Sequence, residues 1–128
     1  MRAEIRHLHT PDIDPYTFIP DDSERFMFLV QMLAGPAGEQ GEESFQFEVC
    51  TPQWLHDRIR REGPINGRHH VIVDAFNWPG LQAYFQRLVA GCTGADWHEI
   101  TTKLSRYGHW EFEDYTVDTP PATPGGEA

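Results

Sequence analysis

Residues 26–34 read FMFLVQMLA, a nearly continuous apolar stretch that ends at Gly35-Pro36. By periodicity alone, a run of this length is compatible with a buried helix or a buried strand. The next segment decides for a strand, because residues 44–50 alternate with period two and place Phe45, Phe47 and Val49 on one face. The two segments therefore predict a long β-hairpin with a polar tip at residues 35–43.

Upstream of this hairpin, the sequence predicts one strand and one irregular segment. Residues 2–9 are typical of an edge strand, with Ile5 and Leu8 on opposite faces. Residues 10–24 contain three prolines and five acidic side chains, which predicts a loop over the surface. We expect three apolar side chains to hold this loop against the core: Tyr16, Phe18 and Ile19.

Downstream of the hairpin, caps and apolar spacing predict three helices and two short strands. The first helix begins at Thr51-Pro52 and ends at Gly63-Pro64. The second occupies residues 79–92, where apolar side chains recur at i, i+3, i+4 and i+7. The third begins at a capping Asp96 and ends at Gly108, where a left-handed cap is expected. The two strands are expected at residues 71–76 and 109–115.

This order of elements is typical of the α+β class. We expect a mainly antiparallel sheet of about five strands, with three helices packed on one face. The chain has 128 residues and a mass of 14.7 kDa, so residues 1–117 should form one domain. Residues 118–128 contain three prolines and two glycines without a large apolar side chain, which predicts a disordered tail.

The chain is strongly acidic, with 20 Asp and Glu against 10 Lys and Arg and a formal net charge of -10. Such a surface repels nucleic acid and anionic lipid, so we expect neither as a partner. No stretch approaches the ~20 apolar residues of a membrane-spanning helix, and the N-terminus lacks a signal-peptide core. Two cysteines, Cys50 and Cys92, are too few for a disulfide scaffold, which favours a cytoplasmic protein.

Histidine and acidic residues fall into three groups with the chemistry of a metal or acid–base site. These groups are His7 and His9 with Asp12 or Asp14, His69 and His70 with Asp74, and His109 with Glu111 and Glu113. Each group also fits an ordinary solvated surface, and His70 and Asp74 on one strand would lie about 13 Å apart. Cys50 lacks a paired base, and no GxSxG, Walker, HExxH or GxGxxG motif occurs. We therefore expect no enzyme activity, no metal and no other cofactor.

Acidic side chains also gather in two parts of the chain, the hairpin tip and the last strand. They are Glu39, Glu42 and Glu43 in the tip, and Glu111, Glu113 and Asp114 in the strand. Such clusters can serve solubility alone, or they can form a docking face for a basic partner. In the second case, nearby aromatic residues can anchor the partner. The candidate anchors are Tyr107, Trp110 and Tyr115.

Four stretches spread over residues 3–115 have a distinctive composition. They read AEIRHLHTPDID (3–14), GEESFQFEVCTPQWL (41–55), GRHHVIV (67–73) and KLSRYGHWEFEDY (103–115). Together they resemble the immunity protein 8 family of bacterial polymorphic toxin systems, and the last stretch is the most specific. The resemblance implies a small intracellular, non-catalytic protein that is encoded beside a toxin gene and neutralises that toxin by binding it.

These observations lead to the hypothesis that the chain binds a cognate toxin and occludes its working site. An acidic protein can fill the basic cleft of a nuclease-type toxin, with carboxylates in the positions of phosphates. The chain would do so as a monomer or a homodimer. Two alternatives remain open: a small metal-dependent enzyme that uses the histidine and acidic residues, and a homodimeric structural module that associates through its apolar sheet face.

Overall fold

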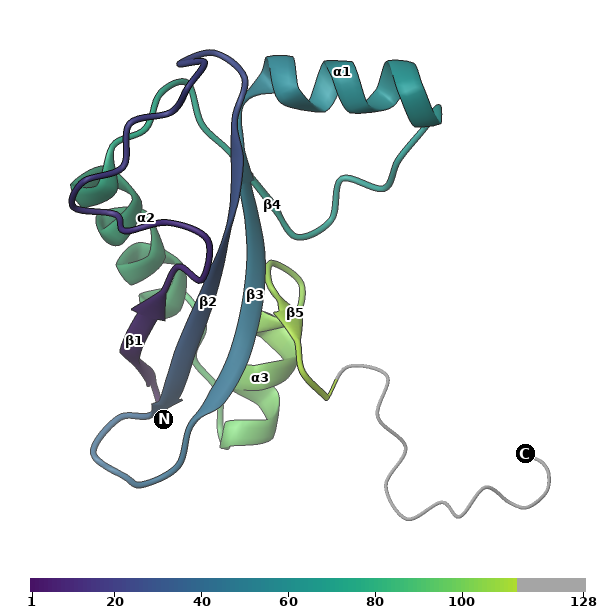
Figure 1. Cartoon of the computed structure of the whole chain (residues 1–128). Helices are drawn as coiled ribbons and strands as arrows, with labels where there is room; N and C mark the ends of the chain where they lie inside the picture. The colour runs from purple at the N-terminus through teal and green to yellow at the C-terminus, as the bar shows by residue number, and fades with distance from the viewer. Residues whose placement is uncertain (113–128) are drawn as a thin grey trace, which may run out of the picture.

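The predicted hairpin forms the centre of the sheet. In the computed structural model, which describes residues 1–112, β2 (Met27–Pro36) pairs antiparallel with β3 (Glu43–Cys50), as Figure 1 shows. Six side chains of this pair point to the same face, and each is at most 1% exposed: Phe28, Val30, Met32, Phe45, Phe47 and Val49. This face forms one wall of the hydrophobic core, as the alternation predicts.

Three shorter strands complete the sheet on either side of the hairpin. β1 (Ala3–His9) pairs antiparallel with β2 and is one edge of the sheet. Along the outer side of β3 lie β4 (His70–Ile72), which is parallel to it, and β5 (His109–Trp110), which is antiparallel. The predicted α+β class with five strands is confirmed, although the sheet is mixed. The parallel pair arises because the chain crosses from β3 to β4 through a helix, which reverses its direction.

Two of the three helices cover the core face of the sheet. α2 (Trp78–Ala90) places the ring of Phe85 4.9 Å from the ring of Phe47 on β3. α3 (Trp97–Leu104) contributes Ile100 and Leu104, both fully buried in the same cluster. Burial of these apolar side chains supplies most of the stability of such a core, at roughly 25 cal/mol per Å².

α1 (Pro52–Glu62) differs from the other two helices because it buries none of its residues. Its Arg58 lies 3.7 Å from Glu48, a β3 residue whose side chain points away from the core face. The expected packing of helices on one face therefore describes α2 and α3, whereas α1 stands beside the opposite face at the upper end of the sheet (Figure 1). Thr51 caps α1 as predicted, since its hydroxyl accepts from the Trp54 amide at 3.3 Å.

A β-bulge in β1 places Ile5 and Leu8 on the same face of the sheet, whereas a regular strand would place them on opposite faces. Ile5 pairs with Ala34 and Leu8 with Met32, so Arg6 is an extra residue on the β1 side. The bulge shifts the alternation by one residue, and both apolar side chains pack against the core. The same bulge turns the Arg6 side chain toward the tip of the hairpin.

Three predicted boundaries changed in the structure. The strand expected at residues 71–76 keeps only three residues, because the chain leaves β3 and an exposed turn leads to α2. The strand expected at residues 109–115 ends at Trp110, residues 111–112 form a turn, and residues 113–117 and the expected tail at 118–128 lie outside the described residues. Gly108 does not form a left-handed cap; a Cβ atom there would lie 2.5 Å from the Phe47 ring.

Candidate partner-binding surface

Two acidic regions border the sheet: one lies at the tip of the hairpin, and the other runs from the middle of the sheet, where β1 ends beside Gln31, to the start of β2 (Figure 1). We call residues 35–44 together with 109–112 the hairpin end, and residues 10–25 the loop end. The 10 residues of β2 run from one end to the other, which at ~3.3 Å per residue corresponds to about 33 Å. All of the predicted partner-binding acids belong to the hairpin end or follow it directly in the sequence.

Arg6 organises the loop at the tip of the hairpin. Its Nη2 atom donates to the carbonyl oxygens of Pro36, Glu39 and Gly41 at 3.1, 2.6 and 3.1 Å. Glu4 contacts the same guanidinium group. A Cβ atom on Gly35 would lie 2.1 Å from the Gly41 carbonyl oxygen, so the loop folds closely over this glycine. The backbone of residues 36–41 is therefore held in one shape by a charged hydrogen-bond donor.

Glu43 joins three elements at the hairpin end. Its carboxylate accepts from the indole Nε1 of Trp97 at the start of α3 and, at 2.6 Å, from the indole Nε1 of Trp110 in β5. Nearby, Glu111 uses its carboxylate to accept from the Ser44 amide at 2.7 Å. Glu43 and Glu111 therefore stabilise the fold and position their neighbours, and their carboxylates are already engaged.

The remaining predicted acids divide into two pairs. Glu39 and Glu42 are exposed hairpin-end acids whose carboxylates have no hydrogen-bond or ion-pair partner within the described residues. Glu113 and Asp114 lie outside the described residues.

The three groups of histidine and acidic residues that could suit a metal are only partly assembled. His7 and His9 are exposed, and their rings stack with centroids 6.0 Å apart. The His109 ring lies 5.3 Å from that of His69, while Glu111 is bound to Ser44. In the part of the chain that the structure describes, no group of three or more His, Cys, Asp or Glu side chains is placed to hold a metal ion.

A charged network joins α1 and β4 to β3. Glu48 lies 3.7 Å from Arg58 and 3.7 Å from the Nε2 atom of His70, whose side chain is 3% exposed. Asp74, which the sequence groups with His70, is exposed to solvent. Burial and the charge of Glu48 raise the pKa of the Cys50 thiol to about 11, with Arg58 opposing them. Cys50 is therefore a neutral thiol near pH 7 and not an activated nucleophile.

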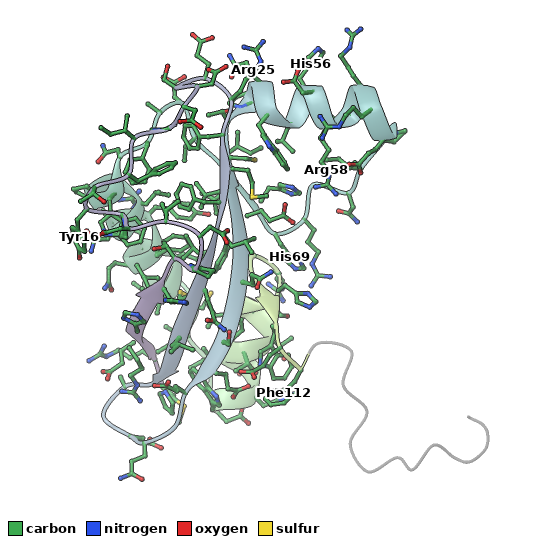
Figure 2. The ribbon with its side chains drawn as sticks, in the orientation of Figure 1. Tyr16, Arg25, His56, Arg58, His69 and Phe112 are labelled. Atoms are coloured by element: carbon green, nitrogen blue, oxygen red, sulfur yellow. The ribbon has the colours of Figure 1, made fainter. Side chains whose placement is uncertain are left out.

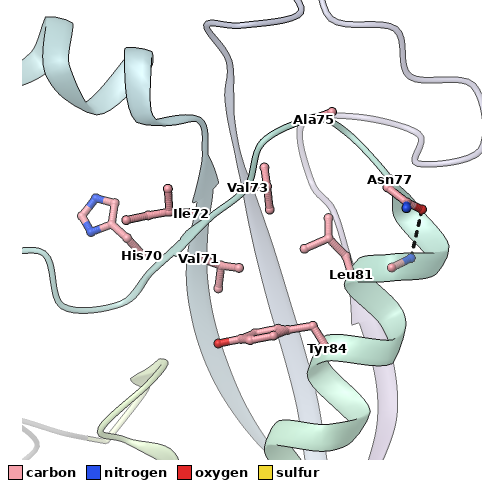
Figure 3. Close-up of a pocket in the computed structure, with 9 residues that line it drawn as sticks. His70, Val71, Ile72, Val73, Ala75, Asn77, Leu81 and Tyr84 are labelled. Carbon is pink, nitrogen blue, oxygen red and sulfur yellow. Dashed lines mark hydrogen bonds between the residues drawn. The ribbon is translucent and has the colours of Figure 1, made fainter.

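A hollow of about 320 Å³ lies between β4 and α2 (Figure 3). Val71, Leu81 and the ring of Tyr84 form its apolar walls. Burial raises the pKa of the Tyr84 hydroxyl, so this group stays protonated well above pH 7. Asn77 at the rim caps α2, where it accepts from the Gly80 amide at 3.0 Å. The hollow can therefore make apolar contacts with a ligand, while the Asn77 side chain at its rim is already used to cap α2.

The loop end differs from its prediction. Phe18 is half-buried and packs against the core, as expected, but Tyr16 is 80% exposed and Ile19 is 84% exposed. The expectation that these two also hold the loop is wrong. The segment has no regular hydrophobic period that would show which side chains face the core. Prolines next to Tyr16 and Ile19 restrict the backbone instead. Sequence reasoning therefore missed two apolar side chains that face solvent among carboxylates.

Comparison with known families gives this surface a context. A family model described as Immunity protein 8 matches residues 3–115. The chain belongs to this family. No solved structure matches it.

As a member of the immunity protein 8 family, the chain has an immunity role, and its partner is a toxin. The match extends over all four of the stretches that carry the resemblance. Within residues 1–112, no helix combines the length and the apolar character that crossing a membrane requires. Because the family's partner is a toxin, the surface to explain is one that recognises another protein.

Proposed function

We propose that this immunity protein neutralises its toxin by direct binding that occludes the toxin's working site, with no catalysis of its own. The observation that carries the proposal is the fixed presentation of Glu39 and Glu42 at the hairpin end. Their carboxylates are free, while Arg6 holds the loop that bears them. A pre-formed loop loses little conformational entropy on binding, which favours tight association.

The chemistry of this surface favours a basic partner. No Lys or Arg occurs between residues 26 and 57, so no positive charge in the hairpin itself offsets the carboxylates. Glu113 and Asp114 add two further negative charges shortly after Trp110 in the sequence. Toxins that cleave nucleic acid need a basic cleft for phosphates, and carboxylates can occupy such a cleft. We therefore propose a nuclease-type toxin as the partner.

The proposal assigns Glu43 and Glu111 a positioning role. Glu43 accepts hydrogen bonds from two indoles, and Glu111 accepts one from the Ser44 amide. Both acids therefore hold the β3 end of the loop that carries Glu39 and Glu42. We place the action of the protein in the cytoplasm, because both cysteines are free thiols. The protein would act there as a monomer or a homodimer.

The test is co-expression with the toxin domain encoded beside the gene, scored for growth rescue and for a co-purified complex. The key variant is Glu39→Lys/Glu42→Lys, which avoids the structural Glu43. The matched control is Gln53→Lys/Asp74→Lys/Ala83→Lys, which makes the same total change in charge at exposed positions on other elements. We expect the key variant to associate about 10-fold more slowly at low salt and the control to stay within about 3-fold of the unmodified protein.

Two results would overturn parts of this proposal. Equal association rates for the key variant and the control at low salt would exclude the hairpin end as the docking face. Growth rescue without any complex would exclude binding as the mechanism and favour enzymatic reversal of the toxin's damage.

A further inference from the structure

The loop end packs against the core through Ile13 and Phe18, and Phe18 makes its aromatic contacts. The ring of Phe18 lies 4.9 Å from Phe76, 5.6 Å from Phe28 and 6.1 Å from Phe26, in edge-on contacts. Turn hydrogen bonds hold the backbone on both sides of Phe18. They run from the Thr17 amide to the Asp14 carbonyl at 3.2 Å and from the Glu24 amide to the Asp22 carboxylate at 2.9 Å.

Tyr16 and Ile19 stand on either side of this anchor and face solvent. They are 80% and 84% exposed, more than the other large apolar side chains of residues 1–112, of which Ile72 is the next at 58%. In Figure 2 the Tyr16 side chain lies on the outer flank of the molecule, far from α1. Two such side chains on a rigid segment lose little entropy when a partner buries them, so they match the anchors of protein interfaces.

Each of these side chains also borders a hollow. Tyr16 lies at the rim of one of about 320 Å³, whose walls include Leu8 and Trp78. Ile19 lies at the rim of another of about 360 Å³, whose walls include Met27 and Trp54. A partner side chain that packs on either residue therefore finds an adjoining recess, which increases the area that contact removes from water.

The charge of the segment specifies the partner. Arg25 is the only Lys, Arg or His of the loop end, and it is paired with Asp22 and Asp57. Asp12, Asp21 and Glu24 are exposed, and no interaction within the described residues engages their carboxylates. These three acids lie within five residues of Tyr16 or Ile19 in the sequence, so a basic surface can bury the two side chains at the lowest electrostatic cost.

We infer that the loop end is a second contact surface for the toxin, in which Tyr16 and Ile19 insert into apolar recesses of a basic face. This inference rests on the proposed function. One partner can reach both ends of the sheet, since a standard interface of ~800 Å² per side is roughly 32 Å across. That width is similar to the ~33 Å length of a 10-residue strand such as β2. The edge strand β1 would lie between the two contact regions.

The test measures binding of the purified toxin domain to paired variants of the full chain. Tyr16→Ala/Ile19→Ala removes the anchors. The control Tyr107→Ala/Ile72→Ala removes one exposed tyrosine and one exposed isoleucine elsewhere, 46% and 58% exposed. We expect the loop variant to bind at least about 30-fold more weakly, mainly through faster dissociation, and the control to change by less than about 3-fold. Urea unfolding of both variants would verify that neither loses its fold.

A second set of variants, which removes negative charge from the loop end, tests whether the partner face is basic. Asp12→Asn/Asp21→Asn/Glu24→Gln should slow association about 5- to 10-fold at low salt and should have little effect at high salt. If association is unchanged at low salt, the partner face is not basic and that part of the inference is wrong. If the unmodified protein binds and the Tyr16/Ile19 variant binds equally well, the inference fails while the proposed function stands. If the unmodified protein does not bind the toxin, both fail.

Discussion

The two ends of the sheet carry similar numbers of acidic residues but use them differently. At the hairpin end, Glu43 binds two tryptophan indoles, and Glu111 binds the Ser44 amide. At the loop end, Asp12, Asp21 and Glu24 extend into solvent beside exposed apolar side chains. A count of carboxylates therefore does not indicate which of them a partner can use. The difference lies in whether a donor from another element already occupies the carboxylate.

The ends also owe their rigidity to different forces. Hydrogen bonds to charged groups hold the hairpin end, where Arg6 binds three carbonyl oxygens of the loop. Apolar packing holds the loop end, where Phe18 inserts among three other phenylalanines. Salt and pH should therefore affect the hairpin end more than the loop end, because apolar burial has little dependence on either.

The largest effect is expected for removal of the loop-end anchor. Phe18→Ala should lower the free energy of unfolding by about 3 kcal/mol, near the low end for a buried phenylalanine because Phe18 is only half-buried. Ile19→Ala, one residue away and 84% exposed, is the control and should change it by less than about 0.5 kcal/mol. Urea denaturation would measure both. Equal effects would mean that Phe18 does not anchor the segment, and the rigid display of Tyr16 and Ile19 would lose its basis.

A smaller effect is expected at the hairpin end. Glu43→Gln keeps the shape of the side chain but replaces one acceptor oxygen with an NH₂ group, which would face an indole N–H. We expect a loss of about 1.5 kcal/mol in the free energy of unfolding. Glu42→Gln is the control, since Glu42 is exposed and its carboxylate unengaged, and should change stability by less than about 0.5 kcal/mol. If the two variants were equally stable, the fold would not depend on the Glu43 carboxylate, and that carboxylate would be available to a partner.

The fold was largely predictable because its strongest signals are local. The alternation of Phe45, Phe47 and Val49 fixes a face, and the apolar spacing in residues 79–92 fixes a helix that buries Leu81, Phe85 and Val89. The bulge at Arg6 was not predictable in this way. It depends on pairing with β2, and only that pairing places Ile5 and Leu8 on the same face.

The candidate surface was less predictable than the fold. The sequence identifies the acids but not their partners. The indoles that bind Glu43 belong to Trp97 and Trp110, which follow it in the chain at separations of 54 and 67 residues. Gly108 illustrates the same limit. A glycine after a helix suggests a local cap, whereas here the neighbouring ring of Phe47 leaves no space for a side chain. Contacts between distant segments determine which side chains remain available to a partner.

The smallest expected effect uses the two buried thiols as reporters of the two ends. Cys50, opposite Met27 in the sheet, lies toward the loop end, and Cys92 precedes Thr93, which pairs with Arg2 toward the hairpin end. Burial raises the pKa of both, to about 11 for Cys50, while Lys103 and Arg106 partly offset the shift at Cys92. A raised pKa favours the neutral thiol, so its contribution to stability is full below the unfolded pKa of about 9 and is lost as the pH rises toward 11.

Between pH 8 and pH 10, the unmodified protein should therefore lose about 1 kcal/mol more unfolding free energy than Cys50→Ala does. The corresponding difference for Cys92→Ala should be smaller, because two cations near Cys92 stabilise its thiolate. Urea denaturation at each pH would measure both differences, and the other titrating groups cancel in the comparison. A larger difference for Cys92 would reverse the order, and the hairpin end would then be the one that keeps its thiol further from water and from positive charge.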